Sequence, residues 1–489
     1  MSTRKKEIGK TILVWFRQDL RRADHPALAA AVREARAVLP VYIWAPEEED
    51  DWAPGAAARV GLHACLAALA GDLEARGSRL IYRQGPPARI LVELARQVDA
   101  DAVYWNQRYE PAARRQEARV TAALSEAGIT VRTFPGGLLH DPAQLLNRSG
   151  KPYKVFGPFA RAFHDHYEHA PPLRAPASLQ PPARWPRGDA LERLGLLPRV
   201  DWAAGIRRFW SFGETAARRQ LRRFMVREAA RYDERRDQLA EDGTSRLSMA
   251  LHFGCLSPHQ VWDAAREELK RQPAPTTREG IESFMRQIVW REFAHHVLYH
   301  FPHTVTQPLR PEFARFPWRR SRRDLRAWQR GRTGYPIVDA AMRQLWETGW
   351  MHNRARMIVA SFLVKDLLLP WQAGAAWFWD TLVDADLANN TFGWQWTAGC
   401  GADAAPYFRI FNPALQGRKF DPEASYVQRY VPALSAITAR DLHGASEALP
   451  DRLRQAGIAL GRAYPEPIVD HAEARERALE ALAAVSQQN

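Results

Sequence analysis

Two runs of sequence decide the fold class of the amino-terminal part: TILVWF at Thr11–Phe16 and VLPVYIW at Val38–Trp44. Both are rich in β-branched and aromatic residues, which favour strands. The alanine-rich stretch Pro26–Arg36 between them has the length and composition of a helix. A strand, a helix and a second strand in this order predict a parallel pair joined by a helical crossover.

The same alternation continues to about residue 135. A helical stretch at Ala57–Arg76 is followed by further apolar runs at Leu80–Arg83, Ala102–Trp105 and Thr130–Phe134. Strands that alternate with helices predict an α/β domain over residues 1–135 with a doubly wound, mostly parallel five-stranded sheet. Ligands of such a sheet bind at the carboxyl ends of the strands. No G-x-G-x-x-G or G-x-x-x-x-G-K-[ST] motif follows a strand, so a dinucleotide or P-loop site is not supported there.

The remainder of the chain divides into a linker and a helical part. Segment 136–205 lacks regular periodicity, and its proline-rich stretch His169–Pro186 is incompatible with a regular helix. Residues 206–489 have helical periodicity and predict a larger all-α domain. Ser257 and Gln260 form a capping box that predicts the start of one helix. The clearest further helices are predicted at Ile281–His300, Tyr335–Thr348, Met351–Leu369 and Ala373–Leu387.

Composition excludes several classes of protein. Charged residues interrupt every apolar run before it reaches the length of a membrane span, so we expect no membrane segment. The polar, basic segment Met1–Lys10 lacks the apolar core of a signal peptide. The three cysteines form no C-x-x-C pair, and the fifteen histidines lack acidic or cysteine partners at metal-ligand spacing. We therefore expect a cytoplasmic protein without a disulfide framework or a metal site.

Charge and tryptophan content indicate a polyanionic partner. Lys and Arg number 69 against 55 Asp and Glu, which leaves +14, and there are 18 tryptophans. Half of this charge lies in Arg310–Arg332, where nine arginines face only Glu312 and Asp324 and where Trp318 and Trp328 are interspersed. This stretch is interpreted either as a solvated face or as a contact with a nucleic-acid backbone.

Polar residues in the helical part indicate a ligand site. Thr244–Ser248 (TSRLS) supplies three hydroxyls ahead of a helical stretch, as expected of a phosphate cradle or of an ordinary helix cap. Asn353 and Met357 lie one helical turn apart. The segment Asp384–Asn390 combines aspartates and asparagines, which are costly to bury unless they hydrogen-bond a polar ligand.

Four longer motifs resemble the photolyase/cryptochrome family and occur in that family's order. They are WFRQDLR at Trp15–Arg21, TGYPIVDA at Thr333–Ala340, GWMHNR at Gly349–Arg354 and FRIFNP at Phe408–Pro413. The resemblance covers nearly the whole chain and is strongest in the helical part, where it is similar to the microbial branch that repairs cyclobutane pyrimidine dimers. It implies an antenna-binding domain at 1–135 and an FAD-binding catalytic domain at 206–489.

The resemblance implies light-dependent DNA repair. Reduced FAD excited by blue light would pass an electron to a flipped-out dimer, whose cyclobutane ring would split before the electron returns. DNA that contains pyrimidine dimers would be the partner, and the protein would be a monomer. Asn390 would face flavin N5, and Arg356 would pair with Asp384 over the ring. By motif position, the full set of FAD-binding residues is Tyr232, Arg236, Thr244, Ser245, Leu247, Ser248, Arg356, Asp384, Asp386 and Asn390.

The resemblance also assigns the lesion site and an electron relay. Trp290 and Trp396 would be aromatic walls on which the dimer stacks. The lesion-binding residues as a set would be Gln287, Trp290, Arg291, Asn353, Arg354, Met357 and Trp396. Three tryptophans would carry electrons from the surface to oxidised flavin: Trp318, Trp371 and Trp394.

Two positions depart from the family pattern. Gln287 stands where dimer-repairing members usually have a glutamate, so a charge-assisted hydrogen bond to the lesion is lost. Ala113 stands where members that bind methenyltetrahydrofolate between the domains often have an acid. Folate bound in another way, 8-hydroxy-5-deazaflavin and no antenna all remain open.

Three alternative functions follow from these features. A (6-4) photolyase is disfavoured, because that branch has two histidines where this chain has Asn353 and Met357. A cryptochrome-type blue-light sensor would share the flavin but not the lesion-binding residues. A basic, tryptophan-rich DNA-binding protein without a cofactor would be colourless.

Overall fold

The amino-terminal domain is built on a five-stranded parallel sheet. In the computed structural model of the chain, which describes residues 9–404, 409–444 and 448–486, the strands run in the order β3-β2-β1-β4-β5. Every neighbouring pair is parallel, and the strand order reverses on either side of β1, which is the doubly wound arrangement predicted. The strands are β1 Gly9–Phe16, β2 Ala35–Trp44, β3 Ile81–Gln84, β4 Ala102–Asn106 and β5 Thr130–Phe134.

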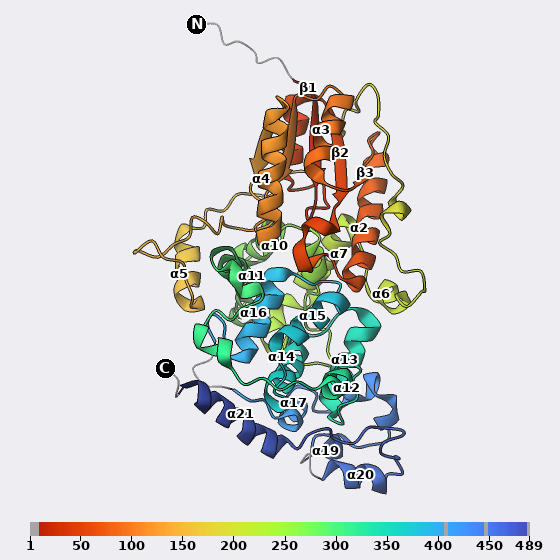
Figure 1. The fold of residues 1–489 in the computed structure, drawn as a ribbon, viewed down its shortest axis with the longest axis vertical. Coiled ribbons are helices and arrows are strands. Elements are labelled where there is room, and N and C mark those ends of the chain that lie inside the picture. Colours follow the sequence, from red (N-terminus) through yellow and green to blue (C-terminus); the bar gives the residue numbers. More distant parts are fainter. Residues whose placement is uncertain (1–8, 405–408, 445–447, 487–489) are drawn as a thin grey trace.

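Side chains of alternating residues in the strands enter different cores. Leu13 and Trp15 of β1 pack with α3 and α4 on one face of the sheet. Val14 and Phe16 pack with α1 and α2 on the other face, in a core that continues into the helical part. Figure 1 shows the sheet at one end of the molecule and the helical domain below it. The four helices of this domain are α1 Pro26–Glu34, α2 Ala56–Glu74, α3 Pro87–Gln97 and α4 Pro111–Glu126.

The linker connects the sheet domain to the helical domain. It contains an α-helix that the sequence did not predict, α5 Phe156–His166, and a short 3-10 helix at Leu191–Leu194. The proline-rich stretch His169–Pro186 has no regular structure, as expected. It runs along the sheet domain, where Val38 donates its N–H to the carbonyl of Gln180 at 2.9 Å.

The helical domain surrounds the long helix α11, which packs against α10, α16 and α5. The predicted capping box is present: Ser257 accepts from the N–H of Gln260, and the Gln260 side chain accepts from the N–H of Ser257. Helix α21 lies at the end of the molecule farthest from the sheet (Figure 1). The helices of this part are α6 Ala204–Phe209, α7 Glu214–Arg227, α8 Tyr232–Arg235, α9 Ser248–His252, α10 Pro258–Lys270, α11 Pro275–His300, α12 Arg322–Gln329, α13 Pro336–Thr348, α14 Asn353–Ser361, α15 Trp371–Thr381, α16 Leu387–Ala398, α17 Pro413–Phe420, α18 Ser425–Tyr430, α19 Ala439–Leu442, α20 Leu449–Gln455 and α21 His471–Ser486.

Three predicted helices differ from the structure at an end. Helix α11 begins at Pro275, before the predicted start at Ile281. The helix predicted at Met351–Leu369 is α14 followed by a π-helical turn at Phe362–Asp366. The helix predicted at Ala373–Leu387 ends at Thr381, because Val383 donates its N–H to Gly349 instead of continuing the helix. Helix α16 then begins behind Asp386, whose carboxylate caps it by accepting from the N–H of Asn389.

One helix passes a length and composition test for a membrane span, although the sequence predicted none. Among the described residues this is α2, Ala56–Glu74, with a mean hydropathy of 1.2. Half of that window is buried inside the protein, where α2 packs against α15 and α7. Its apolar surface is therefore largely used in the core.

Candidate functional site

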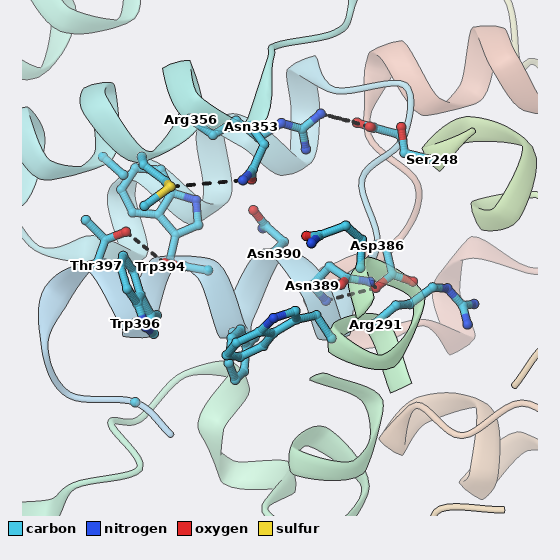
Figure 2. A pocket seen from close by; sticks show the side chains of 18 of the residues that line it. Ser248, Arg291, Asn353, Arg356, Asp386, Asn389, Asn390, Trp394, Trp396 and Thr397 are labelled. Carbon is cyan, nitrogen blue, oxygen red and sulfur yellow. Dashed lines mark hydrogen bonds and ion pairs between the residues drawn. The ribbon is translucent and has the colours of Figure 1, made fainter. Parts of the chain in front are cut away.

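A cavity of about 1320 Å³ opens among helices α9, α11, α14 and α16. Figure 2 shows side chains from these helices around one space, with Asn353 and Arg356 on one side and Asn390 and Trp394 on another. Of the site residues predicted from the sequence, all but two line this cavity. Those lining it are Tyr232, Arg236, Thr244, Ser245, Leu247, Ser248, Gln287, Trp290, Arg291, Asn353, Arg354, Arg356, Met357, Asp384, Asp386, Asn390, Trp394 and Trp396.

The segment Thr244–Ser248 forms a polar lip of the cavity. The side-chain amide of Gln220 on α7 donates to the carbonyl of Ser245 at 3.0 Å and fixes the segment. Arg246 adopts φ +50° and places its guanidinium 5.3 Å from the centre of the Trp350 ring. Tyr232 lies nearby, and burial raises the pKa of its hydroxyl to about 12, so it acts as a neutral hydrogen-bonding group.

An ion pair crosses the cavity wall between α14 and the break before α16. The Arg356 guanidinium donates to both carboxylate oxygens of Asp384, at 3.0 and 2.8 Å, and to the carbonyl of Met351 at 2.8 Å. The Asp384 side chain is 1% exposed and that of Arg356 is 26% exposed. The buried carboxylate therefore holds the guanidinium in place, and the exposed part of the guanidinium is open to the cavity.

A second carboxylate, Asp386, lies among cationic and imidazole groups. Its side chain approaches His295 at 3.5 Å and caps α16 through Asn389 at 2.9 Å. Burial opposes ionisation of this carboxyl, but His295 and Arg291 outweigh that effect and hold its pKa well below the ordinary value. Asp386 is thus an anion and a strong acceptor at the cavity edge.

The opposite part of the cavity is aromatic and amide-rich. Trp290 and Trp396 both line it and are half-buried. Asn353 points its amide toward the sulfur of Met357, at 4.0 Å, and Gln287 donates to the carbonyl of Ser283 at 3.1 Å. These groups suit a flat, polar ligand that stacks between rings.

Comparisons with known proteins agree with this geometry. Residues 12–177 match the model of the DNA photolyase family, and residues 284–484 match the FAD binding domain of DNA photolyase. A deoxyribodipyrimidine photo-lyase of Agrobacterium fabrum is 47% identical over 97% of this chain and 98% of its own length.

This chain belongs to the photolyase/cryptochrome family.

Solved structures of photolyases share the fold. A bacterial class III photolyase from Agrobacterium tumefaciens superposes with a TM-score of 0.93 and 46% identity, over 100% of both chains. An archaeal photolyase from Sulfolobus tokodaii, solved with two FAD molecules, gives a TM-score of 0.81 and 27% identity over 97% of this chain and 100% of that one. The predicted family, fold class and FAD-binding domain are confirmed. The motif at Phe408–Pro413 begins outside the described residues.

The cavity of this photolyase-family chain fits FAD by its own residues. It offers hydroxyls at one lip, an arginine–carboxylate pair along the wall and an anion at the edge. His252 lines it four residues after Ser248, is 8% exposed, and its Nδ1 has no hydrogen-bond partner in the described part of the chain. Burial lowers the pKa of His252, so the ring is neutral and able to bond a polar ligand.

The sequence did not identify every lining residue. His252 and Arg246 were missed, although the first lies one turn along α9 from Ser248 and the second lies within TSRLS itself. Asp237 was also missed; it accepts from Arg354 at 2.6 Å. No sequence spacing signals this last contact, because the two residues come from elements more than a hundred positions apart.

The three tryptophans expected to form a relay lie in one core. Trp394 and Trp371 are each 2% exposed, and Trp318 packs half-buried against the same cluster. The N–H of Arg319 donates to the carbonyl of Leu368 at 2.8 Å, which holds the Trp318 segment beside the start of α15. Trp318 and Trp371 do not line the cavity, whereas Trp394 does.

The arginine-rich stretch does not use both of its tryptophans for a surface role. Trp328 is fully buried, and its indole N–H donates to the carbonyl of Val359 at 2.9 Å. Arg310 and Glu312 line the cavity, so the stretch begins at the cavity rim.

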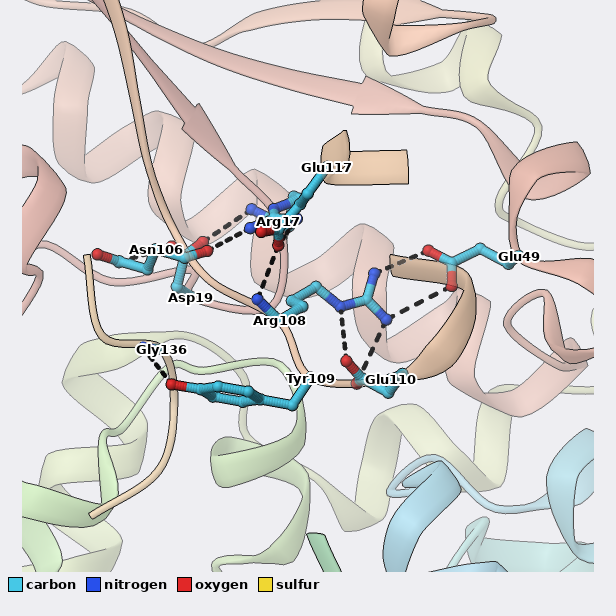
Figure 3. A network of polar contacts seen from close by, with 9 residues as sticks. All are labelled: Arg17, Asp19, Glu49, Asn106, Arg108, Tyr109, Glu110, Glu117 and Gly136. Carbon is cyan, nitrogen blue, oxygen red and sulfur yellow. Dashed lines mark hydrogen bonds and ion pairs between the residues drawn. The ribbon is translucent and has the colours of Figure 1, made fainter. Parts of the chain in front are cut away.

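A second, smaller cavity of about 330 Å³ lies at the carboxyl ends of the strands. Its walls include Trp15, Tyr42, Trp44 and Trp52. Partly buried Arg108 lines it and bonds Glu49 at 2.7 Å, with Glu110 at 3.4 Å (Figure 3).

The described residues were also compared with the ligand sets of metal sites. In the described ranges no three His, Cys, Asp or Glu side chains come together as a possible metal site. Buried Cys65, Cys255 and Cys400 are all free thiols.

Proposed function

We propose that the larger cavity binds FAD and a flipped-out cyclobutane pyrimidine dimer side by side, so that the chain works as a deoxyribodipyrimidine photo-lyase. The observation that carries this is the arrangement of the two residue sets. The hydroxyl lip and ion pair suited to FAD share one space with the aromatic walls suited to paired bases. Similarity to named photo-lyases over nearly the full length supports the same activity.

At the FAD end, each group has a distinct task. Thr244, Ser245 and Ser248 would donate hydrogen bonds to the phosphates and ribityl chain, and Asn390 would hold the flavin ring by its amide. Arg356, held by Asp384, would bring a positive charge to the ring and so favour its anionic reduced form. Tyr232, Arg236, Leu247 and Asp386 complete the lining. When bound and excited by blue light in its reduced form, FAD supplies the electron that opens the cyclobutane ring.

At the DNA end, the protein must take the lesion from the duplex. Flipping costs roughly a few kcal/mol, and less for a damaged pair. Trp290 and Trp396 offset this cost by stacking on the dimer, at about 1–3 kcal/mol per base. Gln287, Asn353 and Arg354 supply hydrogen bonds, while Met357 contacts the lesion as an apolar group and Arg291 adds positive charge.

Trp394, Trp371 and Trp318 would be the route by which electrons from a reductant in solution reach oxidised FAD. Their common core and the increase in exposure toward Trp318 support this order. The route serves activation, not repair, so chemically reduced enzyme does not need it.

The repair assay tests the whole proposal. An oligonucleotide with one cyclobutane thymine dimer is illuminated with blue light in the presence of protein and reductant, beside a dark control. Light-dependent recovery of intact thymines is expected. Binding of the dimer without repair would contradict the proposal, and a parallel (6-4) oligonucleotide then shows whether that lesion is the substrate. The variant Trp290→Ala tests the lesion wall: we expect it to lose repair activity while it keeps its FAD content.

We also propose that the smaller cavity binds an aromatic antenna chromophore. Four aromatic side chains in its walls suit a flat molecule that stacks on them. Release of the bound pigment by denaturation distinguishes methenyltetrahydrofolate, 8-hydroxy-5-deazaflavin and a second flavin by absorbance. Trp52→Ala is expected to lower its occupancy; an unchanged pigment content would refute this location. The protein itself is proposed to be a cytoplasmic monomer.

A further inference from the structure

The lesion wall Trp290 has a close partner in the linker. Its ring stacks on that of Phe156, the first residue of α5, with centroids 3.5 Å apart and planes at 5°. Trp290 lines the large cavity, whereas Phe156 does not. Phe156 therefore covers the face of the indole that is turned away from the cavity.

Other aromatic contacts of Trp290 are less extensive. Phe293 lies edge-on at 6.1 Å and Phe392 is tilted at 5.9 Å. Neither presents a parallel ring, so Phe156 is the contact that fixes the plane of the indole.

Phe156 is itself hydrogen-bonded to the segment that follows α16. Its N–H donates to the Asp403 carboxylate at 3.1 Å, and the N–H of Asp403 donates to the carbonyl of Lys154 at 2.9 Å. Asp403 lines the cavity just after α16, the helix that carries Trp396. These two hydrogen bonds connect the linker to the segment behind the second wall.

We propose that Phe156 is a positioning residue that fixes the plane of Trp290 and, through Asp403, couples the two walls of the lesion site. This inference rests on the proposed role of Trp290 in binding the dimer. A wall that already has its bound orientation loses less conformational freedom when the dimer enters, which favours damaged over undamaged DNA.

A double-mutant cycle tests this role. Phe156→Ala, Trp290→Ala and the double variant are compared for dissociation constants with dimer-containing and undamaged oligonucleotides. Phe156→Ala is expected to lower discrimination by about threefold to tenfold, the range of one aromatic stack. In the Trp290→Ala background the same change is expected to have no further effect on discrimination. FAD content and the unfolding midpoint are recorded for each variant.

Two further variants separate positioning from packing. Phe156→Leu keeps most of the buried volume but not the flat ring, and is expected to lose discrimination as Phe156→Ala does. Phe156→Tyr keeps the ring and is expected to restore it. Phe134→Ala removes a half-buried ring that packs on Tyr104 in the sheet domain, and is expected to leave discrimination unchanged.

The outcomes distinguish this inference from the lesion-site proposal. If Trp290→Ala lowers discrimination but Phe156→Ala does not, or if the two effects simply add, the positioning role is refuted alone. If Trp290→Ala itself leaves discrimination unchanged, the assignment of Trp290 as a lesion wall fails, and the positioning role fails with it.

Discussion

At the scale of single residues, the site depends on buried groups whose charge is decided by their neighbours. Asp386 remains an anion because His295 and Arg291 outweigh the effect of burial. His352, the N-cap of α14, is the opposite case: burial lowers the pKa of its ring to about 4. Its Nδ1 accepts from the N–H of Arg354 at 3.1 Å, a role that only the unprotonated nitrogen can perform.

We predict that His352 makes the free energy of unfolding fall in acid. The unfolded chain binds the proton with a pKa of 6.5 and the folded chain with a pKa of about 4. Stability is therefore present above pH 6.5 and is lost as the pH falls toward 4, by at most about 3 kcal/mol. His352→Asn keeps a capping acceptor without this titration. Urea unfolding at pH 7.5 and pH 5 is expected to show a smaller loss for the variant; an equal loss in both proteins would contradict the prediction.

We predict that replacing Gln287 with glutamate strengthens the binding of dimer-containing DNA. Its amide now donates to the carbonyl of Ser283, which a carboxylate cannot do. In Gln287→Glu the side chain is free to accept from the dimer, and a charge-assisted hydrogen bond is stronger by about 1 kcal/mol. We expect about fivefold tighter binding of dimer-containing DNA, with undamaged DNA unaffected. Glu282→Gln, on the exposed side of the same helix, serves as control. Unchanged affinity would mean that position 287 does not contact the lesion.

At the scale of elements, the close approach of α15 and α16 places Trp394 at the cavity. Gly374 on α15 permits this approach, because a Cβ atom there would lie 2.1 Å from the Trp394 ring. Sequence periodicity identified α15 but extended it through the segment that carries Asp384 and Asp386, and it did not predict α16. The break depends on a hydrogen bond to Gly349, a tertiary contact that local sequence does not encode.

Gly374→Ala tests this helix contact. The added methyl must displace Trp394 or separate the helices, at a cost of about 1–3 kcal/mol. Slower photoreduction of oxidised FAD is expected together with a lower unfolding midpoint. Gly71→Ala on α2 is the matched control, because nothing lies within 4 Å of its added Cβ and helix propensity favours alanine. The prediction fails if Gly374→Ala is as harmless as Gly71→Ala.

At the scale of the whole molecule, the sequence predicted the elements that have local periodicity and the residues that lie in long motifs. The strand–helix alternation gave the sheet, and the motifs identified the lining of the large cavity. Contacts between distant segments were not predictable. The stacking of Phe156 on Trp290 and the bond from Arg354 to Asp237 each join side chains that are separated by more than a hundred residues. Nor did the arginine-rich stretch reveal that Trp328 would be buried within it.

The net charge of +14 leads to a prediction about the arginine-rich stretch Arg310–Arg332, which holds half of it. Arg320, Arg322 and Arg323 are exposed and follow a stretch that begins at the cavity rim. If they contact phosphates, the logarithm of the binding constant falls linearly with the logarithm of the salt concentration. Each lost contact reduces the magnitude of that slope by about 0.9 for duplex DNA. Replacing all three with glutamine is expected to lower the slope by about 2–3 for damaged and undamaged DNA alike, because phosphate contacts do not read the lesion. Arg36, Arg89 and Arg96, exposed on the sheet domain, provide a control with the same loss of charge. An equal change in slope in both triple variants would indicate only long-range attraction, and the stretch would then be a solvated face.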